Sequence, residues 1–238
     1  FAFIYEAFGI LDKKDGKADG VVDFSKPEVM KKMLSDFICM RDEFYNHPSY
    51  LKIAGKPVVV PYVTRSFRNF NAENVRYLEK ELGMELFIIA DEPFFGRQED
   101  PTTAHNGLAA DGKPVFKAYT AYNMFENAKV HEGESALDYM RREAFPIYSK
   151  WGNKTVFCPH VMPTYHDFRG NKTLKGTPEE FRTMIDEVRK IPSQPIGDGI
   201  NRIIMVTSFN EWWEGTTIEP AAEYGTAFLD VIKAVKGR

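Results

Sequence analysis

The sequence has few of the features that mark several common classes of protein. It contains only two cysteines, Cys39 and Cys158, and their wide separation predicts buried small side chains rather than a disulfide framework. No apolar run is long enough to span a membrane, and no secretory leader is visible. The formal net charge is only −3, so we expect neither nucleic acid nor an anionic membrane as a partner.

Motifs that bind phosphate or metal, or that activate a serine, are also missing. No G-x-G-x-x-G follows a strand, and G-x-S-x-G, H-E-x-x-H and C-x-x-C do not occur. A metal site built from His160, His166 and Asp167 is a minor alternative. The sequence therefore predicts chemistry without a metal or another cofactor.

Apolar, β-rich runs alternate with helical segments along the 238 residues. Several of the runs are continuous rather than alternating, as strands buried on both faces of a parallel sheet are. The predicted strands span residues 1–8, 56–63, 84–91, 113–120, 154–161 and 201–208. The predicted helices lie within residues 25–47, 71–83, 134–152, 176–191 and 221–237. Ser25 is the candidate N-cap of the first, and the second and fourth are expected to start at Asn71 and Thr177. This alternation predicts an α/β fold with a parallel sheet.

Six strands are two fewer than a (β/α)₈ barrel of the TIM type contains. The chain opens directly on the strand-like "FAFIYEAFG" and without an initiator methionine. We therefore expect residues 1–238 to form a single catalytic barrel domain whose first two strands lie upstream. A doubly wound open sheet is the alternative architecture.

Polar and aromatic residues follow all six predicted strands, whereas the strand starts carry mainly lysines and turn residues. In barrels the functional groups gather at the carboxyl ends of the strands. Phenols, carboxylates and an imidazole occur there, including Tyr122 and His160. We take eleven residues as candidate substrate contacts: Glu6, Tyr62, Asp91, Glu92, Tyr119, Tyr165, His166, Asp167, Asn210, Trp212 and Trp213.

The segment "NEWWEG" after the last strand places Glu211 and Glu214 three residues apart, with two tryptophans between them. Glycoside hydrolysis needs two carboxyl groups with different protonation states, and aromatic rings suit sugar faces. A purely structural elbow between strand and helix is the competing interpretation. We favour a catalytic pair acting on an oligosaccharide or polysaccharide.

"TSFNEWWEGTTIEPA" (207–221) closely resembles the last-strand signature of glycoside hydrolase family 99, the endo-acting α-mannosidases, and of related domains in polysaccharide biosynthesis loci. The family pattern is roughly S-F-N-E-W-H-E-G-T-x-I-E-x-A, so Trp213 stands in place of histidine. "PTYHDF" (163–168) is similar to the family's P-G-Y-D-D-T, with Thr164 for glycine and His166 for aspartate. Weaker matches occur at residues 4–9 and 47–63.

The resemblance implies a barrel enzyme in which Glu211 is the base and Glu214 the general acid, then base. The base would deprotonate the sugar's own 2-hydroxyl, giving a 1,2-anhydro sugar that water opens with net retention. Glu6, Tyr165 and Asp167 would line the sugar sites, and an extracellular or secretory-pathway location would be expected. The alternative function is a non-catalytic carbohydrate-binding barrel or an accessory domain of a polysaccharide-biosynthesis glycosyltransferase.

Overall fold

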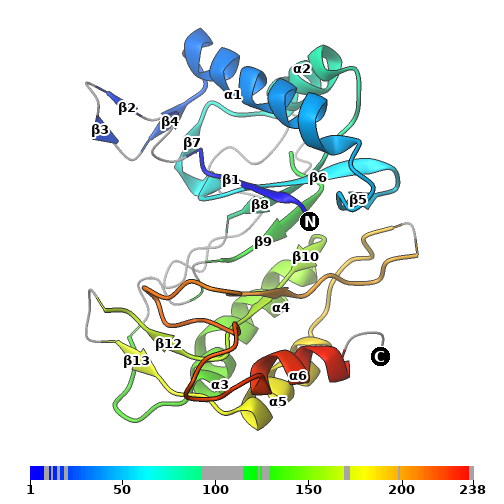
Figure 1. The fold of residues 1–238 in the computed structure, drawn as a ribbon. Coiled ribbons are helices and arrows are strands. Elements are labelled where there is room, and N and C mark those ends of the chain that lie inside the picture. Colours follow the sequence, from blue (N-terminus) through cyan, green and yellow to red (C-terminus); the bar gives the residue numbers. More distant parts are fainter. Residues whose placement is uncertain are drawn as a thin grey trace.

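The chain folds into an α/β structure in which helices flank an array of parallel strands (Figure 1). This computed structural model describes residues 1–7, 11, 13–14, 17–18, 21–92, 115–122, 124, 129–168, 172–197 and 199–235. The predicted fold class, α/β with a parallel sheet, is confirmed for these residues.

The main sheet has the strand order β1-β6-β8-β9-β10, and all of these neighbours are parallel. The strands are β1 (Phe3–Tyr5), β6 (Lys56–Pro61), β8 (Phe87–Asp91), β9 (Ala118–Thr120) and β10 (Phe157–Cys158). In register, Phe3 pairs with Val59, and Val59 in turn pairs with Ile88. Because β6 and β8 are apolar on both faces, they lie buried in the middle of the molecule.

A second parallel pair extends the array beyond β10. The strand β11 (His160–Val161) follows β10 after Pro159 and pairs with β14 (Met205–Val206). The Met205 N–H donates to the Pro159 carbonyl at 2.9 Å, so β14 runs beside the β10–β11 path. All six predicted strands are therefore present, although β14 keeps only two of the eight residues predicted for it.

Four further strand pairs lie around this array, three of them antiparallel and one, β4 with β7, parallel. They involve β2 (Lys13–Lys14) with β3 (Lys17–Ala18), β4 (Val22–Asp23) with β7 (Phe67–Arg68), β5 (Lys52–Ile53) with β6, and β12 (Tyr165–His166) with β13 (Thr173–Leu174). The last pair lies at the carboxyl end of β11 and becomes important for the site.

The helices begin and end mostly where the sequence predicts. They are α1 (Pro27–Met40) with the π-helical η1 (Arg41–Tyr45), α2 (Ala72–Leu82), α3 (Ala136–Tyr139), η3 (Met140–Ala144), α4 (Phe145–Gly152), α5 (Pro178–Val188) and α6 (Ala227–Val235), with a 3₁₀ turn, η2 (Thr64–Ser66). Asn71 and Thr177 each form a capping box, and Gly83 ends α2 with φ +67°. The N-cap expected at Ser25 is wrong: Lys26 occupies that position, and the Ser25 hydroxyl donates to Asp23.

Two apolar layers hold the array in place. The larger layer lies between the strands and the helices and includes Phe37, Val59, Ile88, Tyr119 and Trp151. The smaller layer lies on the opposite face of the strands and contains Val58, Phe87, Ile89, Ala118 and Cys158. Side chains therefore alternate between a helix-facing layer and an inner layer along each strand.

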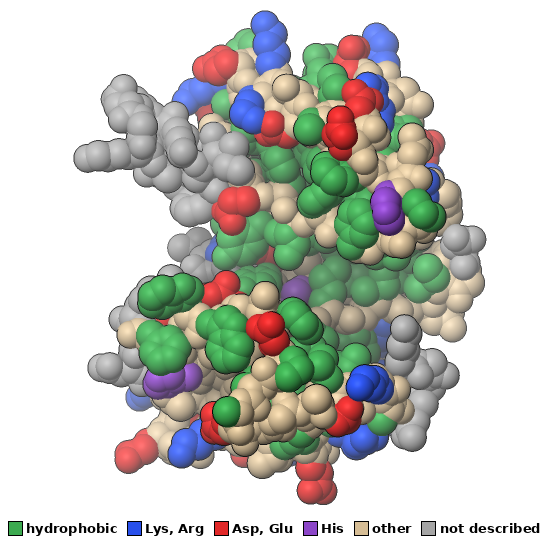
Figure 2. All heavy atoms as spheres, viewed as in Figure 1, with side chains coloured by type: hydrophobic (Ala, Val, Ile, Leu, Met, Phe, Trp, Pro, Cys, Tyr) green, Lys and Arg blue, Asp and Glu red, His purple; other side chains and the backbone are tan. Residues whose placement is uncertain are grey.

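The array does not close within the described residues. There, β1 pairs only with β6, and β14 pairs only with β11. Figure 2 shows the surface hollowed between the part that carries α1 and α2 and the part that carries α3 to α6. Phe1 and Ile4, at and just before β1, are more than half exposed.

In the described part of the chain, no helix combines the length and the apolar character that crossing a membrane requires.

Candidate active site

The loop that carries the two predicted catalytic carboxylates begins directly after β14. The Ser208 N–H donates to the Thr216 carbonyl at 2.7 Å, and the Ile218 N–H donates to the Ser208 carbonyl at 3.1 Å. The Ser208 hydroxyl accepts from the Glu211 N–H at 2.8 Å. These bonds fold residues 208–218 back on themselves, so Glu211 is held by its backbone.

The β12–β13 hairpin holds the same loop from the outside. The His166 N–H donates to the Glu214 carbonyl at 2.7 Å, and the Thr164 hydroxyl donates to the Gly215 carbonyl at 2.6 Å. Gly215 has φ +58°, and a Cβ there would lie 3.1 Å from that of His166. Only glycine suits this close approach without strain. The two segments that resemble family 99 are thus packed against each other.

The carboxylates of Glu211 and Glu214 converge on the phenol of Tyr122. The Tyr122 hydroxyl donates to Glu214 Oε2 at 3.4 Å. Burial, followed by the charges of Glu214 and Glu211, raises the pKa of Tyr122 far above its usual value. Tyr122 therefore stays a neutral hydrogen-bond donor at any physiological pH. Both glutamates are half-buried, which leaves them accessible to a ligand.

A second phenol and an imidazole complete this cluster. The ring of Tyr62 meets the ring of Tyr122 edge-on, with 5.6 Å between centroids, and His160 lies 5.9 Å from Tyr122 on another side. His160 Nδ1 lies 2.7 Å from the Thr207 hydroxyl, and burial lowers the pKa of His160 to about 3. The imidazole is therefore neutral at neutral pH. Three strand ends thus supply the surroundings of the two carboxylates.

Asp91 and Glu92 are predicted substrate contacts that the structure places in the interior. Asp91 is 1% exposed, and its two oxygens accept from the backbone N–H groups of Val63 at 3.1 Å and Tyr122 at 2.9 Å. Glu92 is 2% exposed and accepts a short hydrogen bond from the Thr64 hydroxyl. Asp91 therefore ties the end of β6 to the end of β9.

Tyr119 is also not brought to the carboxylates. Its side chain belongs to the helix-facing layer, where the ring packs 5.1 Å from that of Trp151 and is 1% exposed. The alternation of side chains along β9 explains this position, because Ala118, one residue before it, faces the inner layer. Tyr119 thus lies on the helix side of the sheet.

The other predicted contacts lie around the mouth of the array. Tyr165 is buried, and its hydroxyl donates to Asp167 at 3.4 Å, whereas His166 is exposed and bonded to Thr173. Glu6, Asn210 and Trp213 are exposed. Trp212 is half-exposed, and its indole N–H donates to Glu219 at 3.1 Å. The tryptophans therefore do not enclose the carboxylates; phenols lie beside them instead.

Tyr122 and His160 are the two site residues that the candidate set omits. Tyr122 follows a predicted strand and His160 lies at the end of another, so the strand-end argument already pointed to both. The argument did not say on which face of the sheet each side chain lies. Tyr122 is two residues after Thr120 and His160 two residues after Cys158, so both continue the face of the inner layer. Counting side chains along the strand could have separated Tyr122 from Tyr119.

Side-chain groups that could hold a metal ion were the first alternative to a carboxylate site. Across the described ranges, no group of three or more His, Cys, Asp and Glu side chains could hold a metal ion.

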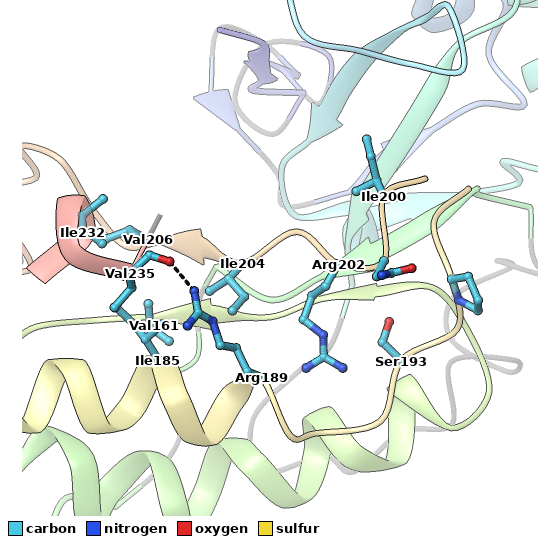
Figure 3. A pocket seen from close by; sticks show the side chains of 12 residues that line it. Val161, Ile185, Arg189, Ser193, Ile200, Arg202, Ile204, Val206, Ile232 and Val235 are labelled. Carbon is cyan, nitrogen blue, oxygen red and sulfur yellow. Dashed lines mark hydrogen bonds between the residues drawn. The ribbon is translucent and has the colours of Figure 1, made fainter. Parts of the chain in front are cut away.

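A cavity of about 950 Å³ lies beside α5, α6 and β14, away from the carboxylates (Figure 3). Its two arginines bind helix-end carbonyls: Arg189 donates to Val235, and Arg202 donates to Val188, both at 2.5 Å. We therefore assign these arginines a structural role.

The fold and the site together define an α/β protein with a glycoside hydrolase-like architecture and a carboxylate pair at the carboxyl end of a parallel strand. Residues 25–232 match the family described as "Glycosyltransferase WbsX", which is related to glycoside hydrolase family 99. The chain belongs to this family.

Solved structures share the fold. A "Glycoside hydrolase-like protein" superposes with a TM-score of 0.69 at 19% identity, over 98% of this chain and 69% of that protein. The GH99 endo-alpha-mannosidase from Bacteroides thetaiotaomicron gives 0.52 at 18% identity, over 82% of this chain and 53% of the enzyme. Its complex with BIS-TRIS-propane gives 0.51 at 18% identity, over 82% of this chain and 56% of that protein. This chain thus spans only about half of the mannosidase, and no curated protein sequence matches it.

Proposed function

We propose that this protein is a retaining glycoside hydrolase that cleaves an internal α-linkage, of the mannoside type, in a glycan. The observation that carries the proposal is the convergence of Glu211 and Glu214 on the phenol of Tyr122 at the end of β14. Two carboxyl groups that can flank a glycosidic bond are what glycoside hydrolysis requires, and both of these remain partly accessible. The similarity in fold to an endo-α-mannosidase supports the choice of sugar.

The roles of the two carboxylates in this proposal are those that the resemblance to family 99 implies. Glu211 takes the proton of the sugar 2-hydroxyl while that oxygen attacks the anomeric carbon. Glu214 gives its proton to the departing glycosidic oxygen as the old bond breaks. Water then attacks the anomeric carbon and loses a proton to Glu214, and the released O2 regains its proton from Glu211. Tyr122, as a neutral donor 3.4 Å from Glu214, positions the acid.

We also propose that residues 1–238 are part of a (β/α)₈ barrel domain, with two more strands between β1 and β14. Among the described strands, β1 pairs only with β6 and β14 only with β11, so each strand has one edge available for a further neighbour. Apolar side chains beside β14, including Ile204, Val206 and Ile232, line the cavity in Figure 3 rather than a closed core. Two β/α units would cover this surface and bring the array to eight strands.

Single substitution of each carboxylate tests the proposed function. We expect Glu211→Gln and Glu214→Gln each to lower turnover of α-manno-oligosaccharides by roughly a hundredfold or more, because each removes one proton-transfer group. Circular dichroism and melting temperature should stay close to those of the wild type. Turnover like that of the wild type in either variant would exclude the carboxylate pair.

The family's description favours a second candidate, transfer of a sugar to an acceptor hydroxyl in place of water. The same pair would then deprotonate the acceptor instead of water. Mass spectrometry of the products separates the two: hydrolysis shortens the oligosaccharide, whereas transfer also yields longer chains. A protein that binds the glycan without changing it would be the carbohydrate-binding or accessory domain of the alternative prediction.

A 2-deoxy substrate tests the intramolecular attack. Without the 2-hydroxyl, no 1,2-anhydro sugar can form, so we expect no turnover although the substrate still binds. Normal hydrolysis of the 2-deoxy substrate would indicate direct attack by a carboxylate.

A further inference from the structure

A groove of about 800 Å³ lies beside the carboxylate loop, between the β12–β13 hairpin and residues 212–224, above the start of α5. One wall contains His166, Phe168 and Thr173, and the other contains Trp212, Gly215 and Tyr224. Gly215 directly follows Glu214, so the groove begins at the catalytic loop itself. The lining of the groove includes neither Glu211 nor Glu214, so it lies next to the carboxylate pair rather than at it.

Exposed aromatic rings stand on both walls. Phe168 is 66% exposed and Trp212 is 50% exposed, and exposed apolar surface gathered in a groove is typical of a ligand-binding site. The bond from the Trp212 indole N–H to Glu219 and the edge-on contact between His166 and Phe168, 5.0 Å between centroids, hold the two rings in place. Fixed aromatic faces of this kind suit the apolar C–H faces of pyranose rings.

The remaining lining is rich in groups that bind hydroxyls. Thr173, Thr217 and Tyr224 bring hydroxyl oxygens, of which Thr173 bonds to His166 and the other two bond to each other. Lys175 brings one positive charge, and Glu180 and Glu223 bring two negative ones. The lining therefore has no strong excess of either charge from these side chains. This chemistry fits a neutral sugar better than an anion such as a phosphate.

The groove and the two carboxylates form one hydrogen-bonded unit. The backbone of β12 and of the residues after it bonds to the loop at Glu214 and Trp213, with 2.7 Å from the His166 N–H and 3.2 Å from the Phe168 N–H. A sugar that stacks on Phe168 is consequently placed in a defined register relative to the carboxylates. The groove can therefore contribute to positioning a chain.

We propose that this groove binds further sugar units of the same glycan chain, beyond those at the carboxylates, with Phe168 and Trp212 as stacking platforms. The inference rests on the proposed function and deepens it, because it makes the substrate an oligomer that extends along the protein surface. The glycan in the groove is neutral and recognised by stacking rather than by charge.

The test uses the disabled variant Glu214→Gln and two probes, a linear α-mannose disaccharide and the corresponding hexasaccharide. Calorimetric titration gives the ratio of the two affinities. We expect the hexasaccharide to bind at least about tenfold more tightly, and we expect Phe168→Ala or Trp212→Ala to reduce this ratio by about tenfold. Tyr77→Ala, which removes a 40% exposed ring on α2, is the matched control and should leave the ratio unchanged.

The outcomes separate this inference from the proposed function. If the wild type cleaves the hexasaccharide but neither groove variant changes the affinity ratio, the groove is excluded and the hydrolase stands. If the hexasaccharide binds in a Phe168-dependent manner and is not cleaved, the groove stands and the hydrolase is wrong. If neither probe binds, both proposals are overturned.

Discussion

Two pairs of acidic residues end strands of the same parallel array, yet their surroundings differ completely. Asp91 and Glu92 follow β8 and are almost fully buried, and they accept hydrogen bonds from the protein itself. Glu211 and Glu214 follow β14, are half-buried, and face a phenol. In sequence both pairs look like active-site carboxylates. The first pair is thus enclosed among hydrogen-bond donors of the protein itself, whereas the second pair keeps accessible surface.

Within the buried pair, Asp91 binds backbone N–H groups at or next to the two tyrosines near the carboxylates. Asp91 accepts from the Tyr122 N–H and from the N–H of Val63, next to Tyr62. Val63 has φ +55°, a conformation that a β-branched residue adopts only with external support. Asp91 therefore fixes the backbone that carries the two phenols. The first pair thus builds the surroundings in which the second one acts.

Removing Asp91 should produce the largest loss of stability. Asp91→Ala leaves two backbone N–H groups without their acceptor, so we expect the free energy of unfolding to fall by about 3 kcal/mol. Asp91→Asn keeps one acceptor oxygen, and it should lose roughly half as much. Denaturant unfolding monitored by circular dichroism measures both values.

Glu211→Gln is the comparison variant in the half-buried pair, and its stability should change by less than about 0.5 kcal/mol. The comparison between the pairs breaks down if Asp91→Ala is as stable as Glu211→Gln. It would also break down if Asp91→Asn lost activity without any loss of stability, since Asp91 would then contact the substrate.

The pH dependence of stability should report His160, the buried imidazole beside Tyr122. The pKa of His160 is about 3 in the folded protein and about 6.5 when unfolded, so the unfolded state binds more protons between these values. Stability is therefore complete above pH 6.5 and is lost as the pH falls. From pH 7 to pH 5 we expect His160 alone to cost about 2 kcal/mol.

Chemical unfolding at several pH values tests this slope. His160→Gln should flatten the slope between pH 7 and pH 5, whereas His131→Gln, which changes an exposed histidine, should not. An unchanged slope in His160→Gln would assign the acid sensitivity to other groups, and the buried imidazole would then have no part in it.

Sequence patterns captured the fold class, the six strands and the caps at Asn71 and Thr177, because these depend on local apolar runs and on short-range hydrogen bonds. They could not distinguish Asp91 from Glu211, because the difference lies in partners such as Val63, which are distant in sequence. They also placed Tyr119 at the mouth, although the alternation along β9 turns it towards Trp151. The sequence patterns located the residues near strand ends, but they did not give the orientation of each side chain or its hydrogen-bond partners.

Tyr122→Phe should have the smallest effect, and it tests whether the buried pair, Asp91 and Glu92, serves the half-buried pair, Glu211 and Glu214. The substitution keeps the ring contacts with Tyr62 and His160 but removes the hydroxyl that donates to Glu214. The loss of one hydrogen bond of about 1 kcal/mol predicts about a fivefold lower kcat on α-manno-oligosaccharides, with KM little changed. Tyr77→Phe, at an exposed ring, is the control. If Tyr122→Phe kept the full kcat, the positions that Asp91 imposes on the phenols would matter for folding alone, and the two carboxylate pairs would act independently.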